Sequence, residues 1–294
     1  MASLKEVKSR ILSVTSTQQI TKAMKMVAAA RLRKAQDNII QMRPYAQKLL
    51  EILHNVSAGN DGDVQNLYAD SRNPDKVLLV VITSDKGLCG PFNSNVFKAT
   101  LQLISEKYKE VQAAGNLTIM PIGKRSLDFF KKRKLQVVED YAMLFTSMNF
   151  TSVREAAEYA MSHFVEGDFD RVHLVYNEFK NVATQILRTE QFLPVEAVET
   201  ESQEVSATDY IYEPSKTEIV EDLIPKSLKI QFYKALLESN AAEHGARMTA
   251  MDKATENAGE LLKELKLTYN RTRQAAITKE ILEIVAGAEA LSSS

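Results

Sequence analysis

Two long heptad stripes, one at each end of the sequence, constrain this chain most. In the first 57 residues, thirteen of sixteen positions spaced alternately by three and four are apolar, from Leu4 to Val56. A similar stripe runs from Leu237 to Ala276. This spacing is typical of coiled-coil helices. Because fifty-five helical residues rise roughly 80 Å, longer than a domain of this size can enclose, we expect the two ends to pair as a stiff shaft.

Local signals predict where the N-terminal helix begins and ends. Ser3 and Glu6 fit a capping box, so the helix should begin almost at the start of the chain. The turn-forming run at 59–62 predicts an end near Ser57. Pro44 lies inside the stripe and predicts a kink or a break in the helix.

Three polar positions interrupt the N-terminal stripe, Gln18, Thr21 and Lys25, beside a segment rich in alanine and methionine. One interpretation is a close-packed coiled coil with a solvated basic face. A second is a surface that slides or turns inside an acid-lined partner. A basic helix lying on a membrane fits less well, because the apolar stripe continues beyond the basic zone.

The C-terminal helix is expected to open at Ser215, where a capping box with Glu218 follows an acidic stretch, and to bend at Pro225. Its stripe slips by one residue at Ile277, which indicates a change in what the stripe faces. Because this helix should outreach its partner, we expect an unpaired apolar tip from about Ile277 onward, sheathed by other protein.

The middle of the chain has a different period. Six consecutive apolar residues at 77–82 are typical of a strand buried on both faces. Further strands are expected at 117–122, 135–138, 171–179 and 182–195, and helices at 93–113, 126–134 and 151–165. The order predicts an open, mostly parallel, Rossmann-like α/β sheet with an antiparallel edge hairpin.

The loop after the first strand, residues 83–91, lies where such sheets bind ligands. It contains Lys86 and two glycines, but not the spacing of a phosphate-binding loop or a dinucleotide fingerprint. Cys89 is the only cysteine and has no activating partner nearby in the sequence. The four histidines, His54, His163, His173 and His244, form no ligand pattern. We therefore expect no catalytic residue, cofactor or metal, and a turn that positions the domain against the shaft.

Charge, cysteine content and hydropathy argue against a nucleic-acid-binding, disulfide-bonded, membrane-spanning or secreted protein. The net charge is -1, which gives no global field for nucleic acid. A single cysteine allows no internal disulfide. No apolar run approaches the ~20 residues of a membrane span, and the first residues lack a secretory signal. We expect a soluble, intracellular protein.

Three segments of the sequence resemble the gamma subunits of F-type ATP synthases. They are STQQITKAMKMVA at 16–28, SDKGLCG at 84–90, and ARMTAM at 246–251 followed by NRTRQAAITKEI at 270–281. Their order and spacing match over essentially the whole chain. The resemblance implies a central rotor shaft inside a ring of alpha and beta subunits, with its foot on the epsilon subunit and on the membrane ring of c subunits. It also implies that the shaft has no catalytic residue and forces the beta sites through different conformations.

The resemblance assigns two groups of contact residues. The beta-subunit contacts are Met24, Lys25, Arg273, Gln274 and Thr278. The foot near the membrane ring and the epsilon subunit includes Tyr210, Tyr212 and Glu213. Some family members have an acid where this chain has a lysine at position 25, so the coupling of rotation could differ. The two-cysteine insert of the photosynthetic members is absent.

The expected organisation is a coiled-coil helix at 1–57, a linker at 58–75, the α/β domain at 76–195, an acidic connection at 196–214, and a coiled-coil helix at 215–294. The expected location is the cytoplasmic face of a bacterial inner membrane, where the protein is peripheral. Two alternatives remain: a nucleotide-binding α/β protein with coiled-coil arms, and a nucleic-acid tether that uses the basic N-terminal arm, although neither nucleic acid nor a membrane span is expected.

Overall fold

The computed structural model describes residues 3–58, 67–195 and 216–292. The chain forms two compact units. We call residues up to 27 together with those from 248 onward the coiled-coil unit, and residues 28–247 the sheet unit. Helix α1 (Leu4–Ala58) and helix α6 (Lys216–Ser292) each contribute to both units. None of the described helices has a stretch long and apolar enough to cross a membrane.

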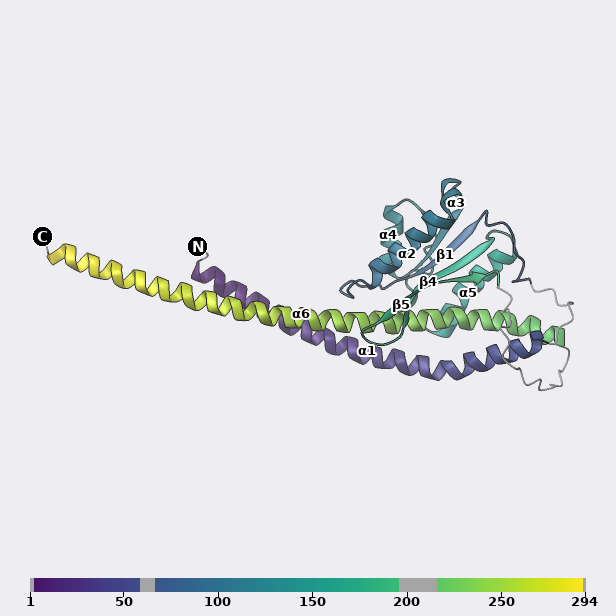
Figure 1. Cartoon of the computed structure of the whole chain (residues 1–294), viewed down its shortest axis with the longest axis horizontal. Helices are drawn as coiled ribbons and strands as arrows, with labels where there is room; N and C mark the ends of the chain where they lie inside the picture. The colour runs from purple at the N-terminus through teal and green to yellow at the C-terminus, as the bar shows by residue number, and fades with distance from the viewer. Residues whose placement is uncertain (1–2, 59–66, 196–215, 293–294) are drawn as a thin grey trace. The chain divides into compact units, whose positions relative to one another are not determined.

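The sheet unit is built on a five-stranded sheet with the order β3-β2-β1-β4-β5. Figure 1 labels three neighbouring strands of this sheet, β1, β4 and β5. The strands are β1 (Val77–Ile82), β2 (Leu117–Ile122), β3 (Gln136–Val137), β4 (Arg171–Phe179) and β5 (Gln185–Leu193). β1 is parallel to β2 and β4, and β2 is parallel to β3, whereas β5 is antiparallel to β4. The expected parallel sheet with an antiparallel edge hairpin is confirmed.

The connecting helices follow the sequence prediction except at 93–113, which is divided, and at 144–147, where no helix was predicted. They are α2 (Phe92–Lys107), α3 (Lys109–Ala113), α4 (Lys124–Lys132) and α5 (Phe150–Val165), with a 3₁₀ helix at Leu144–Ser147. The single helix predicted for 93–113 is divided at Tyr108, whose φ of -126° leaves the helical range. The Tyr108 hydroxyl lies 2.6 Å from His173 Nε2 in the core. This long-range contact accompanies the break in the helix.

The central strand separates two cores. Alternate residues of a strand point to opposite faces. Leu78, Val80 and Ile82 belong to a core shared with α5 and with the first part of α6, whereas Val77, Leu79 and Val81 belong to a core shared with α2 and α4. The first part of α6 contributes Phe232 and Leu236 to the former core. This stretch of α6 is therefore a covering layer of the sheet, a role that its sequence pattern did not reveal.

The predicted stripe of α1 is confirmed by burial. Every described stripe position from Leu4 to Leu49 is buried or half-buried. The predicted break at Pro44 is absent, because α1 continues to Ala58, one residue past the predicted end. Pro44 and Ile40, four residues earlier, both lie on the exposed side. Water can therefore satisfy the carbonyl that loses its hydrogen-bond donor.

We predict that Phe232→Ala destabilises the sheet unit by about 3–5 kcal/mol, the usual cost of emptying a buried aromatic site. Phe232 is fully buried, and its ring packs on Phe192 with centroids 5.7 Å apart. The matched control is Ile40→Ala, since Ile40 is 62% exposed in the same unit. Urea unfolding measures both variants. Equal losses in the two would contradict the assignment of α6 as a layer of this core.

Candidate functional site

The three polar residues that interrupt the α1 stripe meet α6 within the coiled-coil unit. Thr255 Oγ1 lies 2.8 Å from Thr21 Oγ1, and Thr21 donates in turn to the carbonyl of Gln18 at 3.0 Å. Gln18 Nε2 donates to the Thr255 carbonyl at 3.4 Å. Lys25 pairs with Asp252 at 2.5 Å. We call these five residues the polar layer.

The contacts of the polar layer show an antiparallel pair, because residue numbers rise along α1 as they fall along α6. Thr21 is only 9% exposed, so its hydroxyl is held inside the seam. A matched polar pair inside an apolar seam fixes the register of two helices. Gln18 and Thr21 therefore belong to the seam itself. Lys25 is 39% exposed beside Asp252, and Met24 is half-buried.

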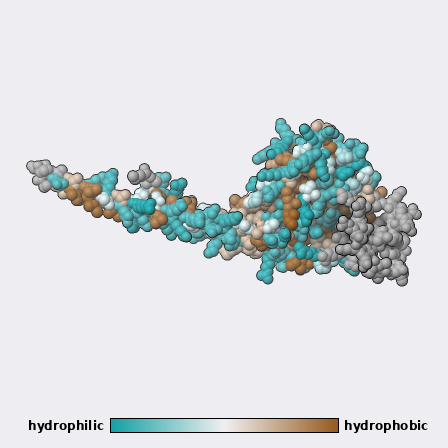
Figure 2. Space-filling view, in the orientation of Figure 1, coloured by the Kyte–Doolittle hydropathy of each residue, from teal (hydrophilic) through white to brown (hydrophobic). Residues whose placement is uncertain are grey.

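The last part of α6 lies outside the seam. The seam is covered from Leu237 to Thr272, and residues 273–289 are all exposed. Arg273, Gln274 and Thr278 lie in this exposed stretch, and Thr278 Oγ1 donates to the Gln274 carbonyl at 3.0 Å. Figure 2 shows hydrophobic surface near the C-terminal end of α6. Its large apolar side chains are Ile277, Ile281, Leu282, Ile284 and Val285, each at least 49% exposed.

The loop after β1 holds its polar groups within the fold. Ser84 Oγ donates to the carbonyl of Lys86 at 2.7 Å, and Asn93 Nδ2 donates to Ser84 Oγ at 2.8 Å. The Ser84 backbone N–H donates to Asn93 Oδ1 at 3.0 Å. Cys89 is buried, and burial is the main cause that raises the pKa of its thiol. A thiol held in the neutral form is a poor nucleophile.

The N-terminus of α4 is also occupied by this loop. The Lys124 N–H donates to Asp85 Oδ1 at 3.0 Å, and the Ser126 N–H donates to Thr83 Oγ1 at 2.9 Å. Gly123 has φ +102°, and a Cβ there would lie 2.1 Å from the Thr83 carbonyl oxygen. Glycine therefore allows the close approach of the loop to α4. The donors that could bind a phosphate at this helix end are used inside the protein.

Arg247 fastens the same loop to α6. Arg247 Nη2 donates to the carbonyls of Lys86 at 2.9 Å and Gly87 at 3.3 Å. Arg247 Nη1 also pairs with Glu243, and both side chains are nearly buried. Burial raises the pKa of Glu243, and Arg247 opposes this effect. Burial also lowers the pKa of the neighbouring His244 to about 4, so that histidine is neutral at pH 7. Two of the segments named in the family resemblance thus meet as a clamp.

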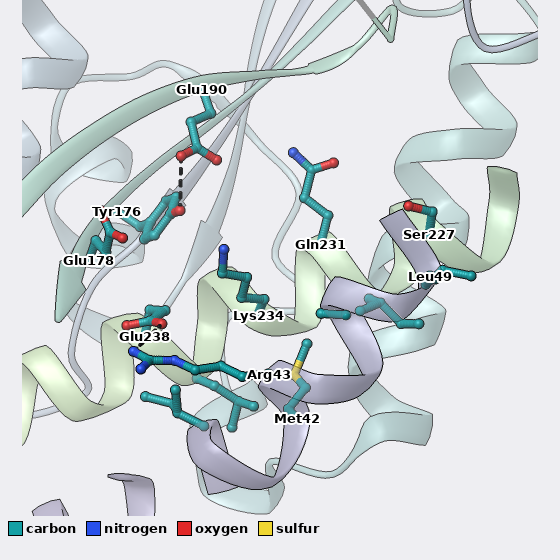
Figure 3. A pocket seen from close by; sticks show the side chains of 14 residues that line it. Met42, Arg43, Leu49, Tyr176, Glu178, Glu190, Ser227, Gln231, Lys234 and Glu238 are labelled. Carbon is teal, nitrogen blue, oxygen red and sulfur yellow. Dashed lines mark hydrogen bonds and ion pairs between the residues drawn. The ribbon is translucent and has the colours of Figure 1, made fainter. Parts of the chain in front are cut away.

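A cavity of about 500 Å³ lies between α1, α6 and the β4–β5 hairpin (Figure 3). Met42 and Leu49 form part of its apolar wall, opposite Tyr176 and Glu190. Tyr176 donates to Glu190 at 3.1 Å. Glu238 is 2% exposed and accepts from the Phe179 N–H at 3.2 Å. Burial raises the pKa of Glu238, and no sequence pattern indicates that this carboxylate lines a cavity.

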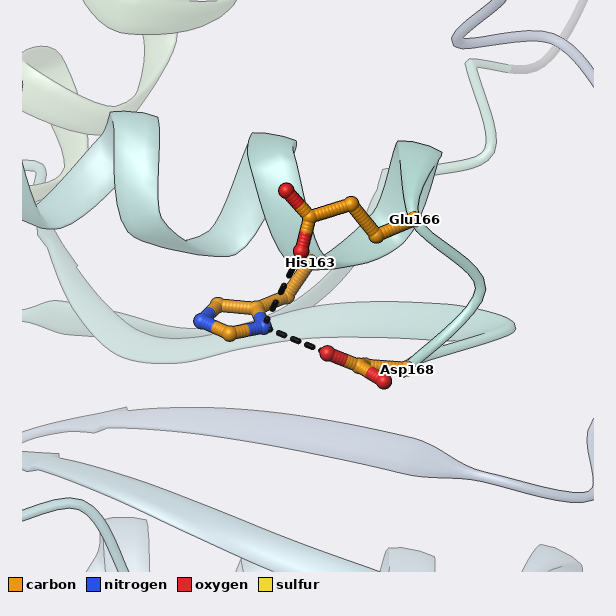
Figure 4. Close-up of side chains that lie close together, drawn as sticks. All are labelled: His163, Glu166 and Asp168. Atoms are coloured by element: carbon orange, nitrogen blue, oxygen red, sulfur yellow. Dashed lines mark hydrogen bonds and ion pairs between the residues drawn. The ribbon is translucent and has the colours of Figure 1, made fainter.

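The fold also brings together three side chains at the C-terminal end of α5, one in its last turn and two just beyond it (Figure 4). His163 Nδ1 lies 2.7 Å from Asp168 Oδ2 and 3.9 Å from Glu166 Oε2. The four histidines share no pattern in the sequence, whereas these two acidic neighbours lie within five residues of a single histidine. The predicted foot residues Tyr210, Tyr212 and Glu213 lie outside the described residues.

Comparison with known proteins decides the family. A protein-family model described as ATP synthase matches residues 3–291. The ATP synthase gamma chain of Cytophaga hutchinsonii is 59% identical over 295 residues, which cover 100% of both chains. The chain belongs to the ATP synthase gamma chain family.

Solved structures agree with this membership. A chain in the central stalk/c-ring structure of the Tetrahymena thermophila mitochondrial ATP synthase is 25% identical, with a TM-score of 0.55 over 80% of this chain and 99% of that one. A chain in the rotor structure of the Euglena gracilis mitochondrial ATP synthase has the same fold, with 23% identity and a TM-score of 0.64 over 93% of this chain and 98% of that one.

We predict that Arg247→Met lowers the free energy of unfolding by ~3–5 kcal/mol, because it leaves the Glu243 carboxyl buried without its partner. The folded-state pKa of Glu243 is already raised and would rise further without Arg247. A carboxyl with a raised folded pKa is most favourable to folding at low pH. The loss of unfolding free energy relative to the unmodified protein should therefore grow as the pH rises above the usual range of a carboxyl pKa, as measured by urea unfolding.

The control for this test is the double variant Glu243→Gln/Arg247→Met, which removes the unpaired charge. It should recover part of the stability and should show no added pH dependence. If Arg247→Met loses the same amount of stability at every pH, the role given to the Glu243 charge is contradicted.

Proposed function

We propose that the chain is the central rotor shaft of a proton-translocating ATP synthase, and that it couples rotation of a membrane ring to conformational change at the catalytic beta subunits. Membership in the gamma chain family over the whole length carries this proposal. The antiparallel helix pair of the coiled-coil unit supports it, because a shaft that transmits torque must resist bending. The Thr21–Thr255 contact adds resistance to sliding of one helix along the other.

The proposed contacts with a beta subunit are in two places. The first place is Lys25, a member of the polar layer, together with its neighbour Met24, where a basic zone suits an acidic partner surface. Lys25 would then share its charge between Asp252 and the partner. The second place is the exposed end of α6, with Arg273, Gln274 and Thr278. Exposed apolar residues beside them are costly in water, which favours a sheath of alpha and beta subunits around this helix end.

The foot is proposed to contact the epsilon subunit and the membrane ring of c subunits through residues 210–213. The expected division of the chain then has a role for each part: residues 1–57 and 215–294 form the axle, and residues 76–195 form a domain held to α6 by Arg247. We place the protein at the cytoplasmic face of a bacterial inner membrane as a peripheral subunit. The bacterial source of the Cytophaga hutchinsonii relative supports this location.

We further propose that the chain has no catalytic residue and binds no cofactor of its own. Within the loop after β1, the side chains of Ser84 and Asn93 bond to each other, and Arg247 binds the loop carbonyls. The N–H groups at the start of α4 bond to Thr83 and Asp85. A nucleotide-binding α/β protein with coiled-coil arms is the alternative, and it would need these groups free.

Reconstitution tests the proposal directly. We predict that the isolated chain hydrolyses no ATP and binds no stoichiometric ATP or NAD in equilibrium dialysis. Alpha and beta subunits assembled with the chain should hydrolyse ATP with steady rotation of a probe fixed to it. Tight stoichiometric nucleotide binding by the isolated chain would favour the alternative function.

A second prediction concerns the end of α6. Arg273→Ala/Gln274→Ala should lower ATP synthesis and hydrolysis by the assembled complex severalfold, because it removes a cation and an amide that donate hydrogen bonds. Both residues are exposed, so the unfolding midpoint should not change. The matched control is Lys253→Ala/Asn257→Ala, which likewise removes one cation and one amide from exposed positions of the same helix. Equal rates in both variants would argue against a contact at 273 and 274.

A further inference from the structure

The end of α5 carries side chains that the shaft function does not use. His163 in the last turn, and Glu166 and Asp168 just beyond it, offer one donor atom each, all within 4.8 Å of one another. We propose that His163, Glu166 and Asp168, called here the α5 trio, bind one divalent transition-metal ion of the zinc type. This site is independent of the proposed rotor function.

The spacing of the donor atoms suits a small ion. The His163 Nδ1 atom faces both carboxylates, at 2.7 Å from Asp168 and 3.9 Å from Glu166 (Figure 4). Donor atoms all within 4.8 Å of one another can surround one ion, because small side-chain rotations would bring them to the ~2.0–2.2 Å of zinc–nitrogen and zinc–oxygen bonds. The side chains are 32%, 65% and 55% exposed for His163, Glu166 and Asp168, so water can complete the coordination.

The backbone holds the α5 trio in place before any ion binds. The N–H of Asp168 donates to the His163 carbonyl at 2.9 Å, and that of Phe169 donates to the same carbonyl at 3.2 Å. Gly167, with φ +81°, makes the reversal that brings Asp168 back over the helix end. The His163 ring lies 4.2 Å from the Tyr159 ring between centroids, which restricts its rotation. A ligand set held in this way loses less entropy on binding.

The donor set and the nearby charges define the ion. One imidazole and two carboxylates suit zinc, nickel or copper better than magnesium or calcium, which prefer all-oxygen sites. Two cations lie on the carbonyls of the same helix end: Lys76 Nζ donates to Gly167 at 3.2 Å, and Arg72 Nη1 donates to Phe164 at 3.2 Å. They oppose a bound cation, so the α5 trio should bind more weakly than a structural zinc site.

Binding also requires a proton to move. Without an ion, a proton on His163 Nδ1 makes the hydrogen bond to Asp168. The metal takes the lone pair of Nδ1, so the proton on that atom must be displaced. The affinity should therefore fall as the pH is lowered.

The test is a titration of the full-length chain with Zn²⁺ by calorimetry, repeated with Co²⁺ to record its visible absorption. We expect a single site, at least tenfold weaker in His163→Gln and unchanged in Glu155→Gln. Glu155 is an exposed carboxylate on the same helix and is the matched charge control. Excess Mg²⁺ should not displace the bound Co²⁺, so the visible absorption should stay unchanged.

A thermal unfolding measurement separates a metal site from a simple helix cap. Zinc should raise the unfolding midpoint of the unmodified chain and leave that of His163→Gln unchanged, because a ligand stabilises only the state that binds it. Undetectable zinc binding by the full-length chain would overturn the proposal. Binding in His163→Gln equal to that of the unmodified chain would also overturn it, since the ion would then bind elsewhere.

Discussion

The antiparallel contact between α1 and α6 at Thr21 and Thr255 is the interaction on which the shaft depends. An apolar heptad seam alone tolerates a slip by a whole heptad, because apolar side chains would meet again. A hydroxyl inside the seam disfavours this slip, since its partner on the other helix would be replaced by a hydrocarbon group and Thr21 would keep only the bond to the Gln18 carbonyl of its own helix. The Thr21–Thr255 pair, 2.8 Å apart, therefore selects one register from several that burial alone would allow.

The long C-terminal helix serves three roles along its length. Its first part covers one face of the sheet through Phe232 and Leu236. Arg247 then binds the loop after β1 through two backbone carbonyls. Beyond this residue the helix pairs with α1 at the polar layer, and its last part is exposed. Because α6 is unbroken from Lys216 to Ser292, these roles are joined by a continuous hydrogen-bonded backbone rather than by loops.

The sequence was sufficient where a local pattern determines the structure. The α1 stripe, the strand at 77–82 and the hairpin at the sheet edge each follow from side-chain periodicity over a few turns or residues. Prediction failed where the cause lies far away in the sequence. The division between α2 and α3 involves a contact from Tyr108 to His173, and the Arg247 clamp joins residues 160 positions apart. No periodicity carries such information.

The three polar residues of the α1 stripe could be located from the sequence, but their partners could not, for the same reason. Gln18, Thr21 and Lys25 were recognised as an interruption, but one helix alone could not show whether they face a partner or the other helix of the same chain. The structure places Thr21 inside the seam, whereas the contact of Lys25 with a beta subunit stays a prediction. The proximity of His163 to Glu166 and Asp168 could not be predicted from periodicity, because these neighbours approach it only after the chain reverses beyond α5.

A designed disulfide tests the register of the two helices most directly. The pair Thr21→Cys/Thr255→Cys should oxidise almost completely in the native protein, because the two hydroxyl oxygens are 2.8 Å apart and cysteine sulfur atoms would take their places. The pair Thr21→Cys/Tyr269→Cys places the second cysteine two heptads further along the same seam, roughly 21 Å away. It should not cross-link. Cross-linking of the second pair in place of the first, or of neither, would contradict the register and the shaft that depends on it.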